Sequence, residues 1–183
     1  MRLSRLSDII ELYATRGEGQ YGEDVTQMEH AVQSAALAEA HGGPPSLIAA
    51  SLLHDIGHLF EPDEAMPGLD HAHERIGAKA LNTLFGDSVC QPVALHVAAK
   101  KYLCFKDRGY FQGLSPASKH SLALQGGVFS RQEAASFERL PYWRDAVALR
   151  RFDDTGKRAE FSRRAFAEFT PLLRQLLIGE AKA

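Results

Sequence analysis

The chain has 183 residues, of which 45% are hydrophobic and 24% charged, and its 21 Lys and Arg nearly balance 23 Asp and Glu. This length and composition are typical of one globular domain, and we expect residues 1–183 to form a single domain. The balanced charge gives no general attraction to nucleic acid or to a membrane surface, so neither is expected as a partner. An anionic ligand would need a local cluster of cationic side chains.

Residues 1–17 place acidic side chains among helically spaced apolar ones, unlike a secretory signal, and no later segment is apolar for long enough to span a bilayer. A cytoplasmic location is therefore expected. Cys90 and Cys104 lie in no CxxC pattern. They are expected to be free thiols rather than parts of a disulfide framework or a thiolate metal site.

The first half of the chain has the pattern of successive helices. Thr26 and Glu29 have the spacing of a capping box at the start of the second helix. GGPP at 42–45 predicts a turn, after which Ser46 is expected to cap a third helix that continues through His58. The apolar stripes of the first two helices are Leu3, Leu6, Ile10 and Tyr13, then Val25, Met28, Val32 and Ala36.

The second half continues in the same way, with one stretch, residues 101–114, expected to be irregular. No segments have the β-branched alternation of strands, and no internal repeat or linker divides the chain, so the sequence predicts an all-α fold. Further helices are expected from about residue 71, over 88–101, from Ser115-Pro116, from the capping box Ser130–Glu133, over 141–154 and over 171–180.

The segment LLHDIGHLF, residues 52–60, sets three ionisable side chains, His54, Asp55 and His58, into an apolar stretch. Burying an imidazole or a carboxylate is costly unless it is hydrogen-bonded, paired with an opposite charge or bound to a metal. On a helix, His54 and His58 share a face, and Asp55 lies about 100° round from His54. All three could therefore line one cavity.

Four other residues interrupt helical segments with side chains of the kind that bind metals. Together with the His-Asp pair of LLHDIGHLF they distribute six potential ligands over five helices, an arrangement that can surround two metal ions. The potential ligands are His30, His54, Asp55, His73, His96 and Asp153.

The bridging position between two such ions suits Asp55, because the two oxygens of a carboxylate can bind ions about 3.5 to 4 Å apart. The second ion would resemble a 2-His-1-carboxylate iron centre with open positions. Two alternatives remain at this point: a helical histidine can be a hydrogen-bonded structural residue, and Asp154 competes with Asp153. One ion would have His30, His54 and Asp153, and the other His73 and His96.

Cationic residues follow the predicted ligands at helical spacing. Lys100 stands four residues after His96, and Arg150 three residues before Asp153. With His58 they could gather positive charge over the open metal, where a phosphate or phosphonate would bind. The alternative is that both are solvated helix charges.

Together these residues resemble a known family. The His-Asp set is similar to the HD-domain superfamily, and the added histidines to its binuclear members. More closely, the chain resembles the mixed-valent diiron HD oxygenases of phosphonate catabolism, whose fold relatives include myo-inositol oxygenase. The segments that carry the resemblance are YGEDVTQMEHA (21–31), HDIGHL (54–59), HERIGAKAL (73–81), HVAAKKYL (96–103), SPAS (115–118) and LRRFDDTGK (149–157).

The resemblance implies an HD-type helical bundle around two iron ions, Fe(II) and Fe(III), with O2 as co-substrate for cleaving the C–P bond of a small 1-hydroxyphosphonate. It implies that the six potential ligands, with Asp153 rather than Asp154, hold the iron, and that His58 and Lys100 act in catalysis. The substrate-binding residues that it implies are Tyr21, Glu23, His58, Lys100, Ser118 and Arg150.

Two activities are known in this group. One converts (1R)-1-hydroxy-2-(trimethylammonio)ethylphosphonate to glycine betaine and phosphate, and the other converts (1R)-2-amino-1-hydroxyethylphosphonate to glycine and phosphate. Residues 21–31 and 96–103 are more similar to the trimethylammonium branch, so we expect that substrate, with Glu23 and aromatic faces around the cation. The resemblance also implies a 2-oxoglutarate-dependent hydroxylase acting before this enzyme.

The alternatives are the primary-amine substrate, an HD-type metal-dependent phosphohydrolase that uses a metal-bound hydroxide, and a non-catalytic HD module. A non-catalytic module is expected to have lost ligands, whereas this chain keeps all six potential ligands.

Overall fold

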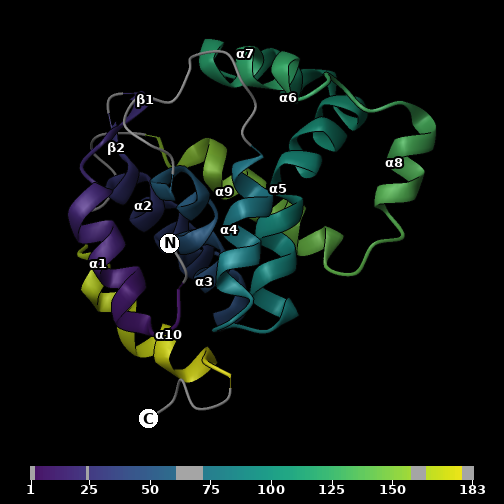
Figure 1. The fold of residues 1–183 in the computed structure, drawn as a ribbon. Coiled ribbons are helices and arrows are strands. Elements are labelled where there is room, and N and C mark those ends of the chain that lie inside the picture. The colour runs from purple at the N-terminus through teal and green to yellow at the C-terminus, as the bar shows by residue number, and fades with distance from the viewer. Residues whose placement is uncertain (1–2, 24, 61–71, 158–163, 179–183) are drawn as a thin grey trace.

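The computed structural model describes residues 3–23, 25–60, 72–157 and 164–178, with the backbone alone for residues 20–23 (Figure 1). Most of this part of the chain is helical, so the predicted all-α fold is confirmed. In chain order the helices are α1 (Leu6–Arg16), α2 (Gln27–Ala40), α3 (Pro45–Leu53), the 3-10 helix η1 (Ile56–Phe60), α4 (His73–Leu81), α5 (Asp87–Lys106), α6 (Arg108–Gly113), α7 (Pro116–Leu124), α8 (Arg131–Phe137), α9 (Trp143–Thr155), the 3-10 helix η2 (Phe166–Phe169) and α10 (Thr170–Leu176).

One antiparallel pair of short strands, which the sequence did not predict, precedes α2. It consists of β1 (Gln20–Glu23) and β2 (Val25–Thr26). The Thr26 hydroxyl then accepts from the Glu29 amide, and the Glu29 carboxylate accepts from the Thr26 amide, so the predicted capping box of α2 is confirmed.

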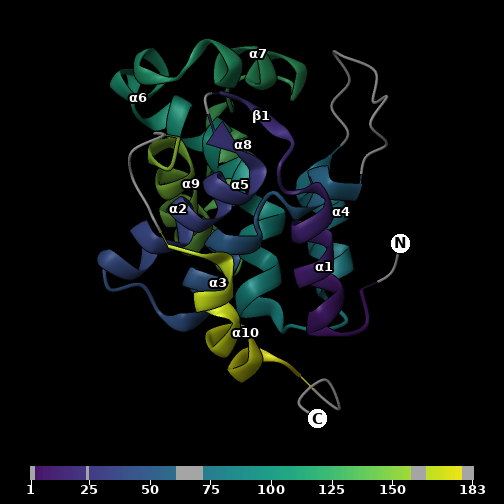
Figure 2. The same ribbon diagram turned by 90° about the vertical axis from the view of Figure 1, so that its left-hand side faces the viewer.

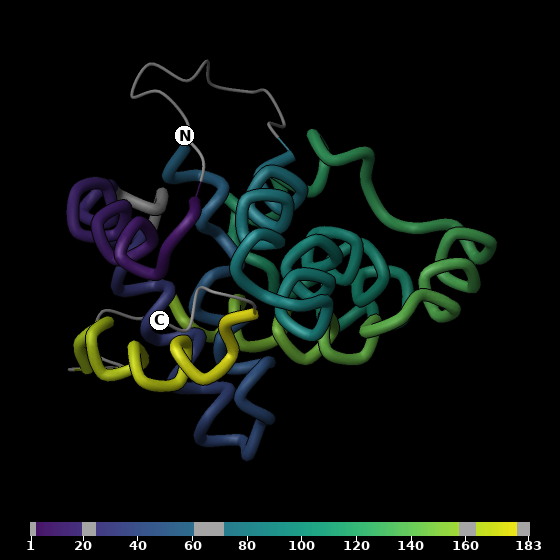
Figure 3. Tube along the Cα trace, turned by 60° about the horizontal axis from the view of Figure 1, so that its bottom comes forward, coloured from purple at the N-terminus to yellow at the C-terminus, as the bar shows by residue number. Residues whose placement is uncertain are grey.

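The long helix α5 lies at the centre of the bundle and packs against α3, α4 and α9 (Figure 1). Helix α2 packs against α3 and α9, which closes the bundle around its middle. Figure 2 looks onto the side that carries α1 and α10, and α6 and α7 form a cap at one end in this view as well as in Figure 1. Figure 3 shows α8 projecting away from the side that carries α1 and α10.

The prediction that the third helix continues through His58 is wrong. Helix α3 ends at Leu53, and His54 and Asp55 form a turn before η1. The His58 amide bonds to the Asp55 carbonyl at 2.9 Å, three residues back, which tightens the chain there. Ser46 does not cap the helix either, because Pro44 is the N-cap and Pro45 occupies the first turn.

The prediction that residues 101–114 are irregular is also wrong. Helix α5 continues to Lys106, and the Asp107 side chain accepts from the Gly109 and Tyr110 amides, which starts α6 at once. The predicted caps Ser115 and Ser130 are confirmed at the starts of α7 and α8.

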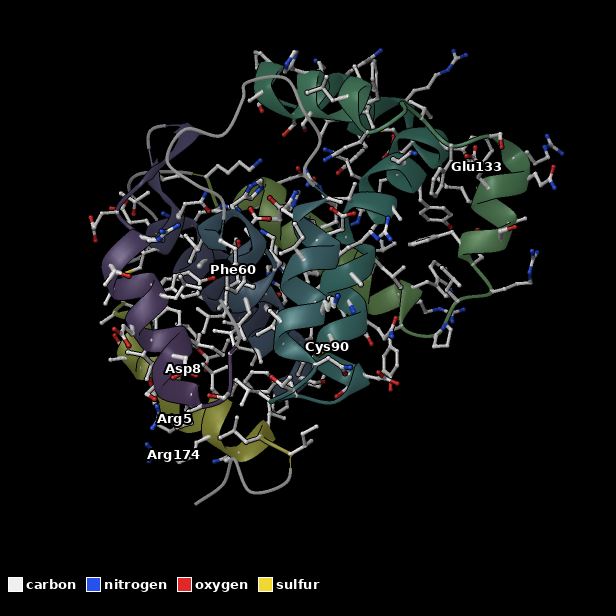
Figure 4. The ribbon with its side chains drawn as sticks, in the orientation of Figure 1. Arg5, Asp8, Phe60, Cys90, Glu133 and Arg174 are labelled. Atoms are coloured by element: carbon white, nitrogen blue, oxygen red, sulfur yellow. The ribbon has the colours of Figure 1, made fainter. Side chains whose placement is uncertain are left out.

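The main core lies between α1, α3, α4, α5 and α10. Ile9 of α1 is buried there, whereas the predicted stripe residue Ile10 is 37% exposed. Phe60 and Cys90, labelled in Figure 4, both belong to this region, with Phe60 partly buried against the core. No helix in the described ranges combines the length and the apolar character needed to cross a membrane.

Candidate active site

The six predicted metal ligands lie together in the middle of the bundle, and none is more than 8% exposed. They come from α2, the turn after α3, and helices α4, α5 and α9. The sequence prediction that these segments converge is therefore supported by the geometry. The ligand atoms of His30, His54 and Asp55 all lie within 4.8 Å of one another, close enough to share one metal ion.

The first half of the cluster contains His30, His54 and Asp153. The Nε2 atoms of His30 and His54 are 3.1 Å apart. Asp153 Oδ1 lies 3.3 Å from His30 Nε2, and Asp55 Oδ2 lies 3.4 Å from His54 Nε2. Two imidazole nitrogens and two carboxylate oxygens thus converge on one point.

The second half contains His73 and His96, whose Nε2 atoms are also 3.1 Å apart. Asp55 Oδ1 lies 3.3 Å from His73 Nε2 and 3.5 Å from His96 Nε2. Since the Oδ2 atom of the same carboxylate faces the first half, Asp55 stands between the two halves with one oxygen toward each. This is the position of a bridging ligand.

Hydrogen bonds fix how the histidines of the first half present their rings. His30 Nδ1 lies 2.8 Å from the Gly156 carbonyl, and His54 Nδ1 lies 2.8 Å from the Ser51 carbonyl. A carbonyl can only accept, so both Nδ1 atoms donate, and the Nε2 atoms of the two rings face each other. Two Nε2 atoms 3.1 Å apart need a cation between them, either a proton on one ring or a metal ion bound by both.

The carboxylates around the cluster also need a cation beside them. Asp55 Oδ2 and Asp153 Oδ1 are buried and accept no hydrogen bond from the described residues. Burial alone would raise their pKa values, but His54 beside Asp55 and Arg150 beside Asp153 hold both pKa values well below the usual range. Both side chains are therefore anionic, and the donor set fits two divalent or trivalent ions with imidazole and carboxylate preferences.

The histidine pKa values differ between the two halves, and near pH 7 a metal bound to the first half would displace a proton from His54. For His54, burial favours the neutral ring, but the Asp55 and Asp153 carboxylates outweigh it and raise the pKa to about 9. For His73, burial and the neighbouring His58 lower the pKa to about 4, against the opposite effect of Asp55. His73 is thus neutral near pH 7, the form that binds metal.

His58, predicted to bind phosphonate, borders the second half of the cluster. It is partly buried, and its ring stacks on His73 with centroids 3.9 Å apart and planes 20° apart. Its ligand atom also lies within 4.8 Å of those of Asp55 and His73. The turn into η1 places it there, rather than the helical spacing assumed from the sequence.

The cationic part of the site is built by α5, α7 and the end of α9. Lys100 is 2% exposed and donates to Ser121 Oγ at 2.8 Å, which donates to the Ser118 carbonyl at 3.1 Å. Lys157 donates to Ser118 Oγ at 3.3 Å, and its Nζ lies 3.7 Å from Asp153 Oδ1. Burial and the charge of Arg150 lower the pKa of Lys100 to about 8.

Arg150 connects this cationic group to the metal cluster. Its Nη1 donates to Asp153 Oδ2 at 2.6 Å, and its Nη2 and Nε atoms contact the two oxygens of Asp154. The choice between Asp153 and Asp154, open from spacing alone, is resolved by geometry: Asp153 faces the histidines, and Asp154 faces Arg150 and the Tyr110 hydroxyl.

Of the predicted substrate residues, Lys100, Ser118 and Arg150 lie near one another beside Asp153, whereas His58 borders the second half of the cluster. The side chains of Tyr21 and Glu23 lie outside the described residues. The sequence reasoning missed the remaining contacts around Arg150 and Ser118. For one of them a signal existed, because Lys157 follows Asp153 by four residues and so continues the same helical face. The missed residues are Tyr110, Ser121, Asp154 and Lys157.

Sequence comparison with known proteins identifies the family of this chain. The sequence profile of the HD domain matches residues 27–119, a range that contains five of the six predicted ligands. The chain belongs to the HD-domain family.

Two relatives in this family carry names that describe an activity. The hydroxymethylphosphonate dioxygenase of Gimesia maris is 46% identical over 157 residues, which cover 84% of this chain and 78% of the relative. The [1-hydroxy-2-(trimethylamino)ethyl]phosphonate dioxygenase (glycine-betaine-forming) of Leisingera caerulea is 39% identical over 173 residues, which cover 91% of this chain and 87% of the relative. An uncharacterized protein of Acanthamoeba polyphaga mimivirus is 34% identical over 161 residues, covering 85% and 74%. The predicted membership in the HD-domain oxygenases is confirmed, and the chain is an enzyme of that class.

Proposed function

We propose that this enzyme uses two iron ions and O2 to cleave the C–P bond of a small 1-hydroxyphosphonate, releasing phosphate and a carboxylate. The observation that carries the proposal is the contact between two clusters: Arg150 bonds directly to Asp153, so an anion bound by Arg150 would lie next to the metals. The names of the two dioxygenase relatives support the same reaction class.

In this proposal His30, His54 and Asp153 hold one iron, His73 and His96 hold the other, and Asp55 bridges them. The ions would supply electrons to O2 and a Lewis-acidic anchor for the C1 hydroxyl. Imidazole and carboxylate donors suit iron, and a carboxylate bridge keeps two ions close enough to share one substrate. The donor set therefore supports the assignment of two irons.

The protein's own contribution is to bind and orient the phosphonate. Lys100, Lys157 and Arg150 supply positive charge, and the Ser118 hydroxyl supplies a further hydrogen bond. The bound phosphonate and the departing phosphoryl group are both anionic. The same cationic residues would therefore stabilise both. His58, on the ring of His73, would lie between the phosphonate and the second metal.

The atoms of this reaction balance with O2 as the oxidant. For hydroxymethylphosphonate, the C–P bond breaks, carbon and phosphorus each gain one oxygen, and the products are formate, hydrogen phosphate and one proton. For the trimethylammonium substrate the same balance gives glycine betaine. No other reductant or oxidant is required.

The group that the substrate carries beyond C1 is the finer part of the proposal. The sequence resemblance favours 1-hydroxy-2-(trimethylammonio)ethylphosphonate. The relative with 46% identity is named for hydroxymethylphosphonate, which has no group there, and this makes hydroxymethylphosphonate a second candidate. In either case the C1 hydroxyl must be supplied by a hydroxylation, and we propose a 2-oxoglutarate-dependent hydroxylase for that step.

The test is phosphate release from three substrates, with and without O2, by protein purified anaerobically and analysed for iron. The substrates are hydroxymethylphosphonate and the two 1-hydroxyethylphosphonates that carry trimethylammonium or amine. We expect O2-dependent phosphate release and about two irons per chain. Phosphate release that continues without O2 would instead support the phosphohydrolase alternative, and a preference among the three would identify the substrate.

A further inference from the structure

The guanidinium of Arg150 is held from two sides, although the residue is only 4% exposed. On one side Nη1 donates to Asp153 Oδ2 at 2.6 Å. On the other, Nη2 donates to Asp154 Oδ1, and Nε lies 3.2 Å from Asp154 Oδ2. Two adjacent carboxylates of α9 thus accept hydrogen bonds from the same guanidinium.

A third group closes this arrangement from a different helix. The Tyr110 hydroxyl, on α6, accepts from Arg150 Nε at 3.2 Å and donates to Asp154 Oδ2. Tyr110 is forty positions before Arg150 in the chain, so the contact ties the cap formed by α6 and α7 to α9. Asp154 and Tyr110 therefore fix the Nε and Nη2 edge of the guanidinium.

This edge is one of those that a guanidinium uses for bidentate pairing with a carboxylate. Since Asp154 takes it, Arg150 offers Asp153 a single N–H on Oδ2, and Asp153 Oδ1 stays directed at His30, 3.3 Å away. If Asp154 were absent, Arg150 could turn its edge to Asp153 and compete with the metal for both oxygens. Three of the five N–H groups donate to groups in the described part of the chain, which leaves one on each Nη for an anion.

We propose that Asp154, supported by Tyr110, is a positioning residue that orients Arg150 so that it serves the metal ligand Asp153 and the phosphonate at once. The proposal deepens the proposed function and rests on it for the identity of the anion. It assigns Asp154 no contact with the substrate, because its effect passes through the planar guanidinium.

The test is a double-mutant cycle with the dissociation constant of inorganic phosphate as readout, measured by calorimetry on metal-loaded full-length protein without O2. Asp154→Asn should raise this constant at least about tenfold in the wild-type background. In an Arg150→Lys background, which has no planar edge to orient, the same substitution should change it by less than about twofold. Asp145→Asn, in the first turn of α9, is the matched control and should have no effect in either background.

Equal changes in both backgrounds would show a merely structural role for Asp154 and overturn the proposal, as would no change in the wild-type background. Tyr110→Phe, which removes only a hydroxyl, serves if Asp154→Asn does not fold; it should raise the constant about two- to fivefold, and no change would overturn the proposal. Phosphate binding is measured without turnover. If the enzyme showed no O2-dependent reaction, the proposed function would fail, but the binding cycle would still test the role of Asp154.

Discussion

The Nε2 atoms of His30 and His54 face each other at 3.1 Å, while the Nδ1 atom of each ring donates to a backbone carbonyl. Without a cation this contact would set two lone pairs against each other inside the core. The carbonyls of Gly156 and Ser51 accept the hydrogen bonds that orient the two rings. The backbone therefore directs both Nε2 atoms to the point where a metal would bind.

Asp55→Asn should remove both metals, because the carboxylate oxygens face both halves of the cluster and an amide nitrogen cannot replace one of them. Elemental analysis of the purified variant should give fewer than about one ion per chain, against about two for the wild type. Asp87→Asn, an exposed position at the start of α5, is the control. A full metal content in Asp55→Asn would exclude the bridging role.

Gly57→Ala should disrupt the second half of the cluster through the backbone. A Cβ atom at Gly57 would lie 2.0 Å from the His73 carbonyl oxygen, so η1 and α4 would have to separate. We expect destabilisation of about 1–3 kcal/mol, measured by chemical unfolding, together with loss of one metal. Gly113→Ala, where a Cβ meets nothing within 4 Å, should change neither, and equal behaviour of the two variants would refute this packing argument.

The affinity for the phosphonate should fall above about pH 8. Burial and Arg150 lower the pKa of Lys100 to about 8, so raising the pH past this value removes its charge from the free enzyme. Below that pH the ammonium is present and binding is at its strongest. We expect kcat/KM to fall about tenfold per pH unit above the pKa, since this parameter reports the free enzyme.

The matched variant for this pH dependence is Lys100→Arg, because a guanidinium keeps its charge throughout the range. Its kcat/KM should be lower at neutral pH, since the geometry differs, but should stay level between pH 8 and 10. A decline of the same steepness in Lys100→Arg would assign the titration to another group.

Lys157→Met should weaken substrate binding and leave the metals in place. Its Nζ contacts Ser118 Oγ and lies 3.7 Å from Asp153 Oδ1, between the metal ligand and the predicted phosphonate site. We expect KM to rise about tenfold with a smaller change in kcat, measured by phosphate release. Lys79→Met, an exposed position on α4, is the control. An unchanged KM would remove Lys157 from the site.

The sequence predicted the ligands better than the backbone that carries them. His54 and Asp55 lie in the buried cluster of potential ligands, as the spacing suggested, yet they stand in a turn after α3 rather than on a helix. The cause is a tertiary contact, the approach of Gly57 to the backbone of His73, and no local pattern reports it. Residues 101–114 were missed as helix because Asp107 ends α5 with an extended backbone and its side chain caps α6 directly afterwards.

The contacts around Arg150 could not be predicted for a similar reason. Spacing placed Arg150 and Asp153 on one face but could not distinguish Asp153 from Asp154, which differ by about 100° on the helix. The distinction depends on Tyr110, forty residues away, and on the histidines of α2 and the turn after α3. Long-range partners of this kind are visible only in the folded chain.

The most direct test of the proposed reaction is the ratio of O2 consumed to phosphate released by the iron-loaded enzyme in a sealed cell. An oxygen electrode and a phosphate assay on the same sample, with hydroxymethylphosphonate and the trimethylammonium substrate in turn, measure both quantities. The proposed reaction predicts a ratio of about one with the true substrate and no release by Asp55→Asn. Phosphate released with no O2 consumed would contradict it.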